Sequence, residues 1–76
     1  MTREDWMENF SENLQDILDE RGVKQRELSD MTGIPTSTIS AYINQAIMPS
    51  AEAVVKISYA LDVEFNDLLD FGDTID

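Results

Sequence analysis

The sequence contains no cysteine and no histidine. Without cysteine there is neither a disulfide framework nor a thiolate ligand, and without histidine the chain lacks the most common general base and neutral metal ligand. The sixteen acidic residues form neither an EF-hand loop nor an HExxH pattern, so they indicate a solvated surface rather than a metal cage. We therefore expect no catalytic site, no small-molecule substrate, no metal and no cofactor.

The chain also lacks any apolar run of about eighteen residues, which argues against a transmembrane helix or a secretory signal. We therefore expect a cytoplasmic protein that does not associate with a membrane. A length of 76 residues suits one domain with one small core. We place this domain at residues 1–71 and a short acidic tail at 72–76.

Basic residues are scarce: the chain has five, against sixteen acidic ones, and a formal net charge of −11. Proteins that bind nucleic acid usually have a basic footprint, so this charge argues against such a function. However, residues 31–51 carry no charged side chain, and Arg21, Lys24 and Arg26 lie just before them. Because salt screens charges over about 8 Å, an acidic protein can still bind phosphates through a surface that is locally neutral to positive. The acids are expected mainly on the first helix, the far side of the fourth and the C-terminal segment.

The uncharged window is rich in hydroxyl and amide groups. These belong to Thr36, Ser37, Thr38, Ser40, Asn44 and Gln45. An uncharged stretch is often simply buried, but buried polar groups need partners that a small core rarely supplies. The composition therefore favours a surface that contacts a partner through uncharged hydrogen-bonding groups.

Apolar spacing predicts an all-α chain without a competing strand signal. The five predicted helices cover residues 4–21, 25–32, 35–44, a segment that starts after Ser50 as N-cap, and about 65–69. Thr2 begins a capping box, Gly33 suits a left-handed residue at the end of the second helix, and Pro35 suits the first position of the third. The predicted central core consists of Leu28, Ile39, Val54, Ile57 and Leu61, with Phe10, Leu14, Ile17 and Leu18 from the first helix and Met31 on the same face as Leu28.

The second and third predicted helices are joined by a tight turn that contains a glycine, which is the arrangement of a helix-turn-helix. Small Ser29 lies where the two helices must cross closely, Gly33 follows four positions later, and Ile39 follows six positions after that. Any pair of antiparallel helices can show a glycine turn, so the turn alone does not identify a family.

From residue 10 to residue 69 the chain resembles the Cro/C1-type helix-turn-helix family of phage repressors and bacterial regulators. The resemblance rests on Gln25-Arg26-Glu27-Leu28-Ser29, Gly33-Ile34, Ser37-Thr38-Ile39-Ser40, Pro49-Ser50, Ala60-Leu61-Asp62-Val63 and Leu68. It implies a compact, five-helix, lambda-repressor-like DNA-binding domain and no enzyme. Its third helix would enter the major groove of a palindromic double-stranded DNA operator. The protein would act as a dimeric, sequence-specific transcriptional regulator, and the family suggests a phage-like repressor.

The resemblance also assigns roles to residues. Base-reading positions would be Thr36, Ser37, Ser40 and Ala41, and phosphate-binding positions would be Lys24, Gln25, Arg26, Thr38 and Asn44. Hydroxyl groups can donate or accept at base edges, and methyl groups can contact a thymine methyl, whereas strongly discriminating bidentate contacts are few. Part of any specificity would then come from DNA shape. An alternative for Lys24 and Arg26 is pairing with Glu27 and Asp30 on the same helix.

The chain departs from the family after the third helix, where the family usually has a glycine followed by basic residues. Here the residues are Gln45, Ala46, Ile47 and Met48, so a phosphate clamp is missing. Gln45 occupies a position that often needs positive φ, a strain of about 1 kcal/mol for a residue with a Cβ. A homodimer is expected through some of the apolar residues without a core role, namely Ile47, Met48, Phe71 and Ile75. The alternative function is a protein-interaction module, anti-repressor or antitoxin-like, that retains the fold with weakened DNA binding.

Overall fold

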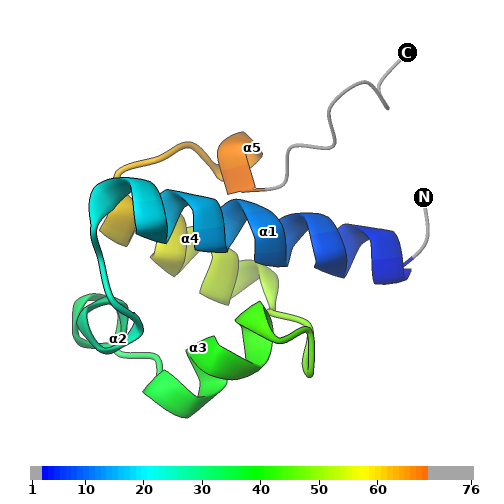
Figure 1. The fold of residues 1–76 in the computed structure, drawn as a ribbon, viewed down its shortest axis with the longest axis horizontal. Helices are drawn as coiled ribbons and strands as arrows, with labels where there is room; N and C mark the ends of the chain where they lie inside the picture. Colours follow the sequence, from blue (N-terminus) through cyan, green and yellow to red (C-terminus); the bar gives the residue numbers. More distant parts are fainter. Residues whose placement is uncertain (1–2, 69–76) are drawn as a thin grey trace.

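The computed structural model describes residues 3–68, and all regular elements in this range are helices (Figure 1). They are α1 (Arg3–Arg21), α2 (Gln25–Thr32), α3 (Thr36–Ile43), α4 (Ala51–Leu61) and the single turn α5 (Phe65–Leu68). The all-α prediction is confirmed, and the observed bounds lie within one residue of the predicted ones. Thr2 of the predicted capping box, residue 69 and the predicted tail lie outside the described residues.

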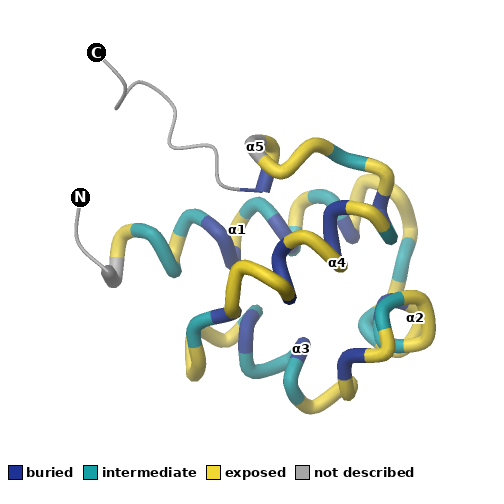
Figure 2. Tube along the Cα trace, turned by 180° about the vertical axis from the view of Figure 1, so that it is seen from behind, coloured by how far each residue is buried: buried dark blue, intermediate teal, exposed yellow. Residues whose placement is uncertain are grey.

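The helix α1 runs across the molecule and separates α3 from α5 (Figure 1). It packs against both of them, α2 packs against α3 and α4, and α4 packs against α5. The view from behind agrees, with α3 on one side of α1, α5 on the other, and α4 in front (Figure 2). None of the helices over residues 3–68 has the length and apolar character needed to cross a membrane.

The core forms where α2, α3 and α4 meet α1. The predicted central residues are all buried, namely Leu28, Ile39, Val54, Ile57 and Leu61. They are joined by Phe10, Leu14 and Leu18 from α1, and by Leu68, which the sequence pattern did not assign to the core. Ile17 is only partly buried. The prediction that Met31 shares the buried face of Leu28 is wrong, because Met31 is 51% exposed and lies beside Lys56 and Tyr59 at the rim between α2 and α4.

Two contacts fix the C-terminal half of α3 to α1. The rings of Phe10 and Tyr42 meet edge to face with centroids 6.3 Å apart, and Trp6 stacks on Phe10 at 5.8 Å. Ser11 is buried, and its hydroxyl donates a hydrogen bond of 2.6 Å to the carbonyl of Tyr42. Edge-to-face aromatic pairs and a buried hydrogen bond each contribute about 1 kcal/mol. This side of α3 is therefore held by the core and leaves the opposite side free.

The N–H groups of Gly33 and Ile34 in the turn between α2 and α3 both have acceptors within the chain. Gly33 adopts a left-handed conformation with φ of 79°, as predicted, and its N–H donates to the carbonyl of Ser29 at 2.8 Å. The hydroxyl of Thr32 donates to the carbonyl of Leu28 and accepts from the N–H of Ile34. Because the N–H groups of Gly33 and Ile34 have partners and Ile34 is buried, the direction of α3 relative to α2 is set.

Candidate functional site

The outer face of α3 collects the four residues predicted to read bases. Thr36 and Ser37 are exposed, and Ser40 and Ala41 lie one turn further on and are half-buried. Residues four positions apart are neighbours on a helix surface, so the four side chains form one patch of hydroxyl and methyl groups. Ile39 and Tyr42, on the opposite side, are buried in the core.

The N-terminus of α3 is open. Pro35 is the N-cap rather than the first helical residue, and its carbonyl accepts from the N–H groups of Thr38 and Ile39 at 3.0 Å each. Proline has no side-chain acceptor, and the first turn contains no acidic residue. Within residues 3–68 the N–H groups of Thr36 and Ser37 therefore have no acceptor. Free N–H groups and the positive end of the helix dipole are suited to an external anion.

The N-terminus of α2 is arranged differently. The backbone N–H of Lys24 donates to Oε1 of Glu27 at 2.9 Å, which is half of a capping box. The ammonium group of Lys24 cannot accept a hydrogen bond, so the other half is missing. Because the Glu27 carboxylate lies at this helix end, a phosphate approaching Gln25 would meet a negative charge. The α3 end is the more open anion site of the two.

The residues predicted to bind phosphate at the start of α2 are exposed or half-buried. Lys24 and Arg26 are exposed and Gln25 is half-buried. Among the described residues, neither Lys24 nor Arg26 forms a salt bridge to Glu27 or Asp30; the ion pair found there joins Lys56 to Glu52 at 3.5 Å. The alternative of pairing along α2 is thus not observed. Both cations remain available for an external partner.

Thr38 and Asn44 stand at the two ends of α3. Thr38 is half-buried in the first turn, whereas Asn44 is exposed at the C-cap. Nδ2 of Asn44 donates to Oγ of Ser40 at 3.3 Å, so the residue predicted to bind phosphate also contacts a predicted base-reading residue. A hydroxyl that accepts this bond keeps its own proton for donation. The pair therefore presents Ser40 to a partner as a hydrogen-bond donor.

The loop after α3 closes without a glycine. Gln45 adopts φ of 62°, which confirms the predicted left-handed conformation. The carbonyl of Ala41 accepts from the N–H of Ala46 at 2.8 Å. Ile47 is 46% exposed and Met48 is half-buried, whereas Phe71 and Ile75 lie outside the described residues. Apolar side chains thus stand where the family would place its basic clamp.

The acidic residues are distributed away from α3. Seven of them belong to α1, and the window from residue 31 to residue 51 has none. The expectation that the far side of α4 carries many acids is wrong, since Glu52 is the one acid in that helix. The charge-free surface on α3 therefore remains the part of the described molecule that can approach a polyanion at lowest electrostatic cost. No group of three or more potential metal ligands is found among the described residues.

Among the comparisons with known proteins, a family model matches the chain. The chain matches the family described as Helix-turn-helix over residues 14–68, a range that starts within α1 and ends with α5. No curated protein and no solved structure matches the chain. The matched range contains α2, the turn at Gly33 and the whole of α3.

Proposed function

Because the chain belongs to the Cro/C1-type helix-turn-helix family of non-enzymatic DNA-binding domains, we propose that it is a transcriptional repressor that binds a palindromic operator as a dimer. Family membership indicates a DNA-binding transcriptional regulator. The repressor role, the palindrome and the dimer are our proposal. The observation that carries it is the open N-terminus of α3, which offers free N–H groups beside a patch of hydroxyl side chains and without a carboxylate.

In this proposal α3 lies in the major groove with its outer face toward the bases. Thr36, Ser37 and Ser40 read base edges by hydrogen bonds, and Ala41 contacts a thymine methyl group. Ser40 acts as a donor because Asn44 donates to it. Acceptors in the major groove, such as the guanine N7 and O6 atoms or the thymine O4 atom, are then its preferred partners.

Phosphate contacts come from both ends of the helix-turn-helix. Lys24 and Arg26 supply charge, Gln25 and Thr38 supply uncharged donors near the helix N-termini, and Asn44 supplies the second N–H of its amide at the end of α3. The Gln25 contact is the weakest of these, because the Glu27 carboxylate lies at the same helix end. Such contacts set affinity and orientation but carry no sequence information.

The same proposal covers the assembly. The complete domain has five helices, with Phe65–Leu68 as the last, and dimer contacts are made by some of Ile47, Met48, Phe71 and Ile75. A small two-fold interface of this kind gives a weak dimer in the absence of DNA. A regulator of this family acts where the DNA is, in the cytoplasm of its cell.

The deciding experiment is selection of bound sequences from random double-stranded DNA, followed by affinity measurements on the selected motif. Ser37→Ala and Thr36→Ala should change the selected motif, whereas Lys24→Ala and Gln25→Ala should weaken binding to all sequences alike. Gln15→Ala, in which a polar side chain is removed from α1, is the matched control and should change neither. The same motif from the parent and both α3 variants would show that α3 is not the reader.

A second candidate function is a protein-interaction module that keeps the fold. It is favoured by the net charge of −11 and by the apolar side chains that replace the clamp. A gel shift at low and moderate salt separates the two functions. Absence of DNA binding at low salt, where phosphate contacts are strongest, would leave the interaction module in place of the repressor.

A further inference from the structure

We propose that the outer face of α4 and α5 is a second binding surface, which takes a basic amphipathic segment of a partner protein. This inference does not depend on DNA binding. It rests on the apolar side chains that this face exposes, on the hollows between them, and on the sign of the charges around them.

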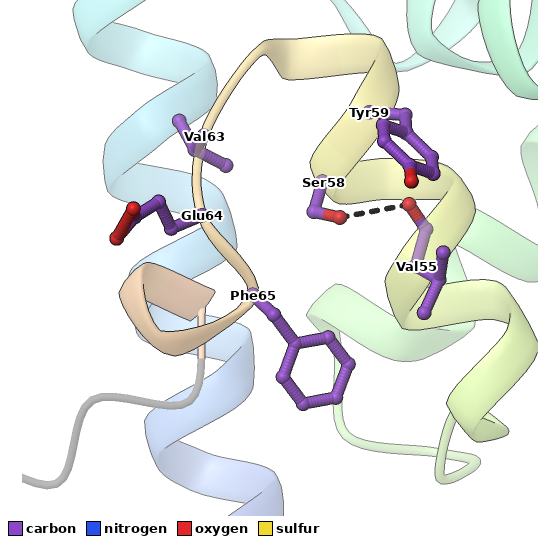
Figure 3. Close-up of a pocket in the computed structure, with 6 residues that line it drawn as sticks. All are labelled: Val55, Ser58, Tyr59, Val63, Glu64 and Phe65. Carbon is purple, nitrogen blue, oxygen red and sulfur yellow. Dashed lines mark hydrogen bonds between the residues drawn. The ribbon is translucent and has the colours of Figure 1, made fainter.

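Three of the large hydrophobic side chains that the described molecule exposes belong to this face. Tyr59 is 83% exposed, Phe65 40% and Val55 38%. They surround an open groove of about 440 Å³, in which the ring of Phe65 reaches across from α5 toward α4 (Figure 3). Its remaining wall is formed by Ser58, whose hydroxyl is already bonded to the carbonyl of Val55, and by Val63 and Glu64.

A second hollow of about 380 Å³ adjoins the first. It is lined by Met31, Thr32, Lys56, Tyr59 and Ala60. Tyr59 belongs to both hollows, so the two form one continuous surface that extends from α5 across α4 to the end of α2. Along α4 the residues Val55, Lys56 and Tyr59 recur at the spacing of one helix face. Exposed apolar side chains that line a continuous, hollowed surface are typical of protein interaction sites.

The charges around this surface select the partner. Residues 51–68 contain the acids Glu52, Asp62, Glu64 and Asp67 and one basic residue, Lys56. Lys56 is already paired with Glu52 at 3.5 Å, which leaves three carboxylates without a cation. A second copy would place the same excess negative charge against itself, and DNA or an anionic membrane would be repelled in the same way. The occupant therefore carries positive charge, together with apolar side chains for the hollows.

The part of this surface that Phe65 and Tyr59 form is separate from the one that α3 presents, whereas its other end, at Met31 and Thr32, lies just before the turn into α3. In both views α5 and α3 lie on opposite sides of α1 (Figures 1 and 2). A partner held by Phe65 and Tyr59 at the α5 end thus leaves the N-terminus of α3 open.

The test uses the full chain labelled with ¹⁵N and two synthetic helical peptides of about 18 residues. Both have leucine at helical spacing, and they differ only in having lysine or glutamate at the other positions. The lysine peptide should shift the amide signals of Val55, Tyr59 and Phe65 and leave those of Ser37 and Ser40 unchanged, with an affinity that falls as salt is raised. The glutamate peptide should shift none of them. Equal binding of both peptides, or shifts centred on α3, would overturn the proposal.

Variants test the surface itself. Tyr59→Ser and Phe65→Ser should each weaken binding of the lysine peptide at least about tenfold, because a few residues, often aromatic, contribute most of the binding energy of such interfaces. Tyr59 is 83% exposed, so the thermal melt of Tyr59→Ser should match that of the parent; Phe65 is only 40% exposed, so Tyr59→Ser decides if Phe65→Ser melts lower. Ile47→Ser, which removes from the loop after α3 an apolar side chain that is 46% exposed, close to the 40% of Phe65, is the matched control and should leave the affinity for the lysine peptide unchanged.

Two other occupants would contradict the proposal. If the Tyr59 amide signal shifts when the chain alone is diluted, and Tyr59→Ser abolishes that shift, the surface belongs to a second copy. If Phe71→Ser with Ile75→Ser shifts the same signal in the absence of peptide, it belongs to the C-terminal segment of the chain itself. Constant signals in both experiments, with the lysine peptide bound, are the result expected here.

Discussion

The two helices that follow the turn at Gly33 begin in contrasting ways and end in similar ones. At the start of α4, Oγ of Ser50 accepts from the N–H of Ala53 at 3.1 Å, and Glu52 adds a negative charge to the first turn. At the start of α3, Pro35 offers no side-chain acceptor and no acid follows it. Each helix is followed by a left-handed residue, Asp62 after α4 and Gln45 after α3.

This difference separates stability from function. Together, an N-cap serine and an acidic residue in the first turn stabilise a helix by about 1 kcal/mol or somewhat more. The α4 helix has both features, and no binding role is proposed for its N-terminus. The α3 helix lacks both, and its free N–H groups at Thr36 and Ser37 are the groups that an external anion needs. The missing cap is thus the structural counterpart of the proposed DNA contact.

On their buried sides the two helices should behave alike. Ile39 of α3 and Ile57 of α4 are both completely buried, so replacing either by alanine should cost about 2 to 5 kcal/mol in the free energy of unfolding. Denaturant unfolding measures this, with the exposed Ser37→Ala as control, for which we expect less than about 0.5 kcal/mol. An Ile39→Ala protein as stable as the parent would mean that α3 is not packed as described.

The loop between the two helices provides the next test. Gln45, Ala46 and Ile47 are all exposed, so Gln45→Gly with Ala46→Lys and Ile47→Arg can rebuild a basic clamp without disturbing the core. DNA affinity should rise about tenfold or more. If Arg21, Lys24 and Arg26 alone neutralise phosphates, the slope of log affinity against log salt in the parent is no steeper than about −2.7 per protomer, or −5.4 per dimer. The two new cations should steepen it by about 1.8 per protomer.

The control for the clamp carries the same charges elsewhere. Glu8→Lys with Glu12→Lys on α1 raises the net charge by more than the clamp does, but on the helix that carries seven of the sixteen acids. It should steepen the slope much less than the clamp variant. Equal effects would mean that net charge, rather than contact at the end of α3, governs binding.

Much of the fold could be predicted because local chemistry determined it. Ser50 had to cap α4 because a hydroxyl preceded an apolar helical stripe, and the left-handed conformation of Gly33 followed from its place after a short helix. The positive φ of Gln45 could be predicted from the family pattern, in which a glycine stands at that position.

The rest depended on tertiary packing. Met31 lies three residues after Leu28, so periodicity gave both the same face, but Leu28 is completely buried whereas Met31 stays 51% exposed at the rim between α2 and α4. Ser11 lies three residues before Leu14 and seven before Leu18, and this spacing was the available signal that it belongs to the buried face of α1. The exposed face of Tyr59 and Phe65 could not be predicted, because an apolar residue near the end of a helix is assigned to the core unless the neighbouring helices are known. In the site, the proximity of Asn44 to Ser40 follows from helix spacing, whereas the direction of their hydrogen bond does not.

Changing the N-cap of either helix should alter the free energy of unfolding by about 1 kcal/mol, but only the change at α3 should also alter DNA binding. Ser50→Ala should cost about 0.5 to 2 kcal/mol and leave DNA affinity unchanged. Pro35→Asp should be more stable than the matched Pro35→Ala by a similar amount, because its carboxylate can accept from the free N–H groups of α3. The same carboxylate should weaken DNA binding relative to Pro35→Ala. Stronger or equal DNA binding by Pro35→Asp would show that the α3 N-terminus does not face phosphate.

The smallest effect is expected at the left-handed residues that follow the two helices. For a residue with a Cβ this conformation costs about 1 to 2 kcal/mol, and aspartate tolerates it better than glutamine because its short polar side chain can hydrogen-bond locally. Glycine removes the strain but adds freedom to the unfolded chain, which offsets about 0.4 to 1 kcal/mol. Gln45→Gly should therefore stabilise the protein by up to about 1 kcal/mol, and Asp62→Gly should change it little. The denaturant midpoint at constant slope measures both. Equal gains at the two positions would mean that the loop after α3 carries no more strain than the end of α4, and that the missing glycine is not a cost particular to the binding side of the molecule.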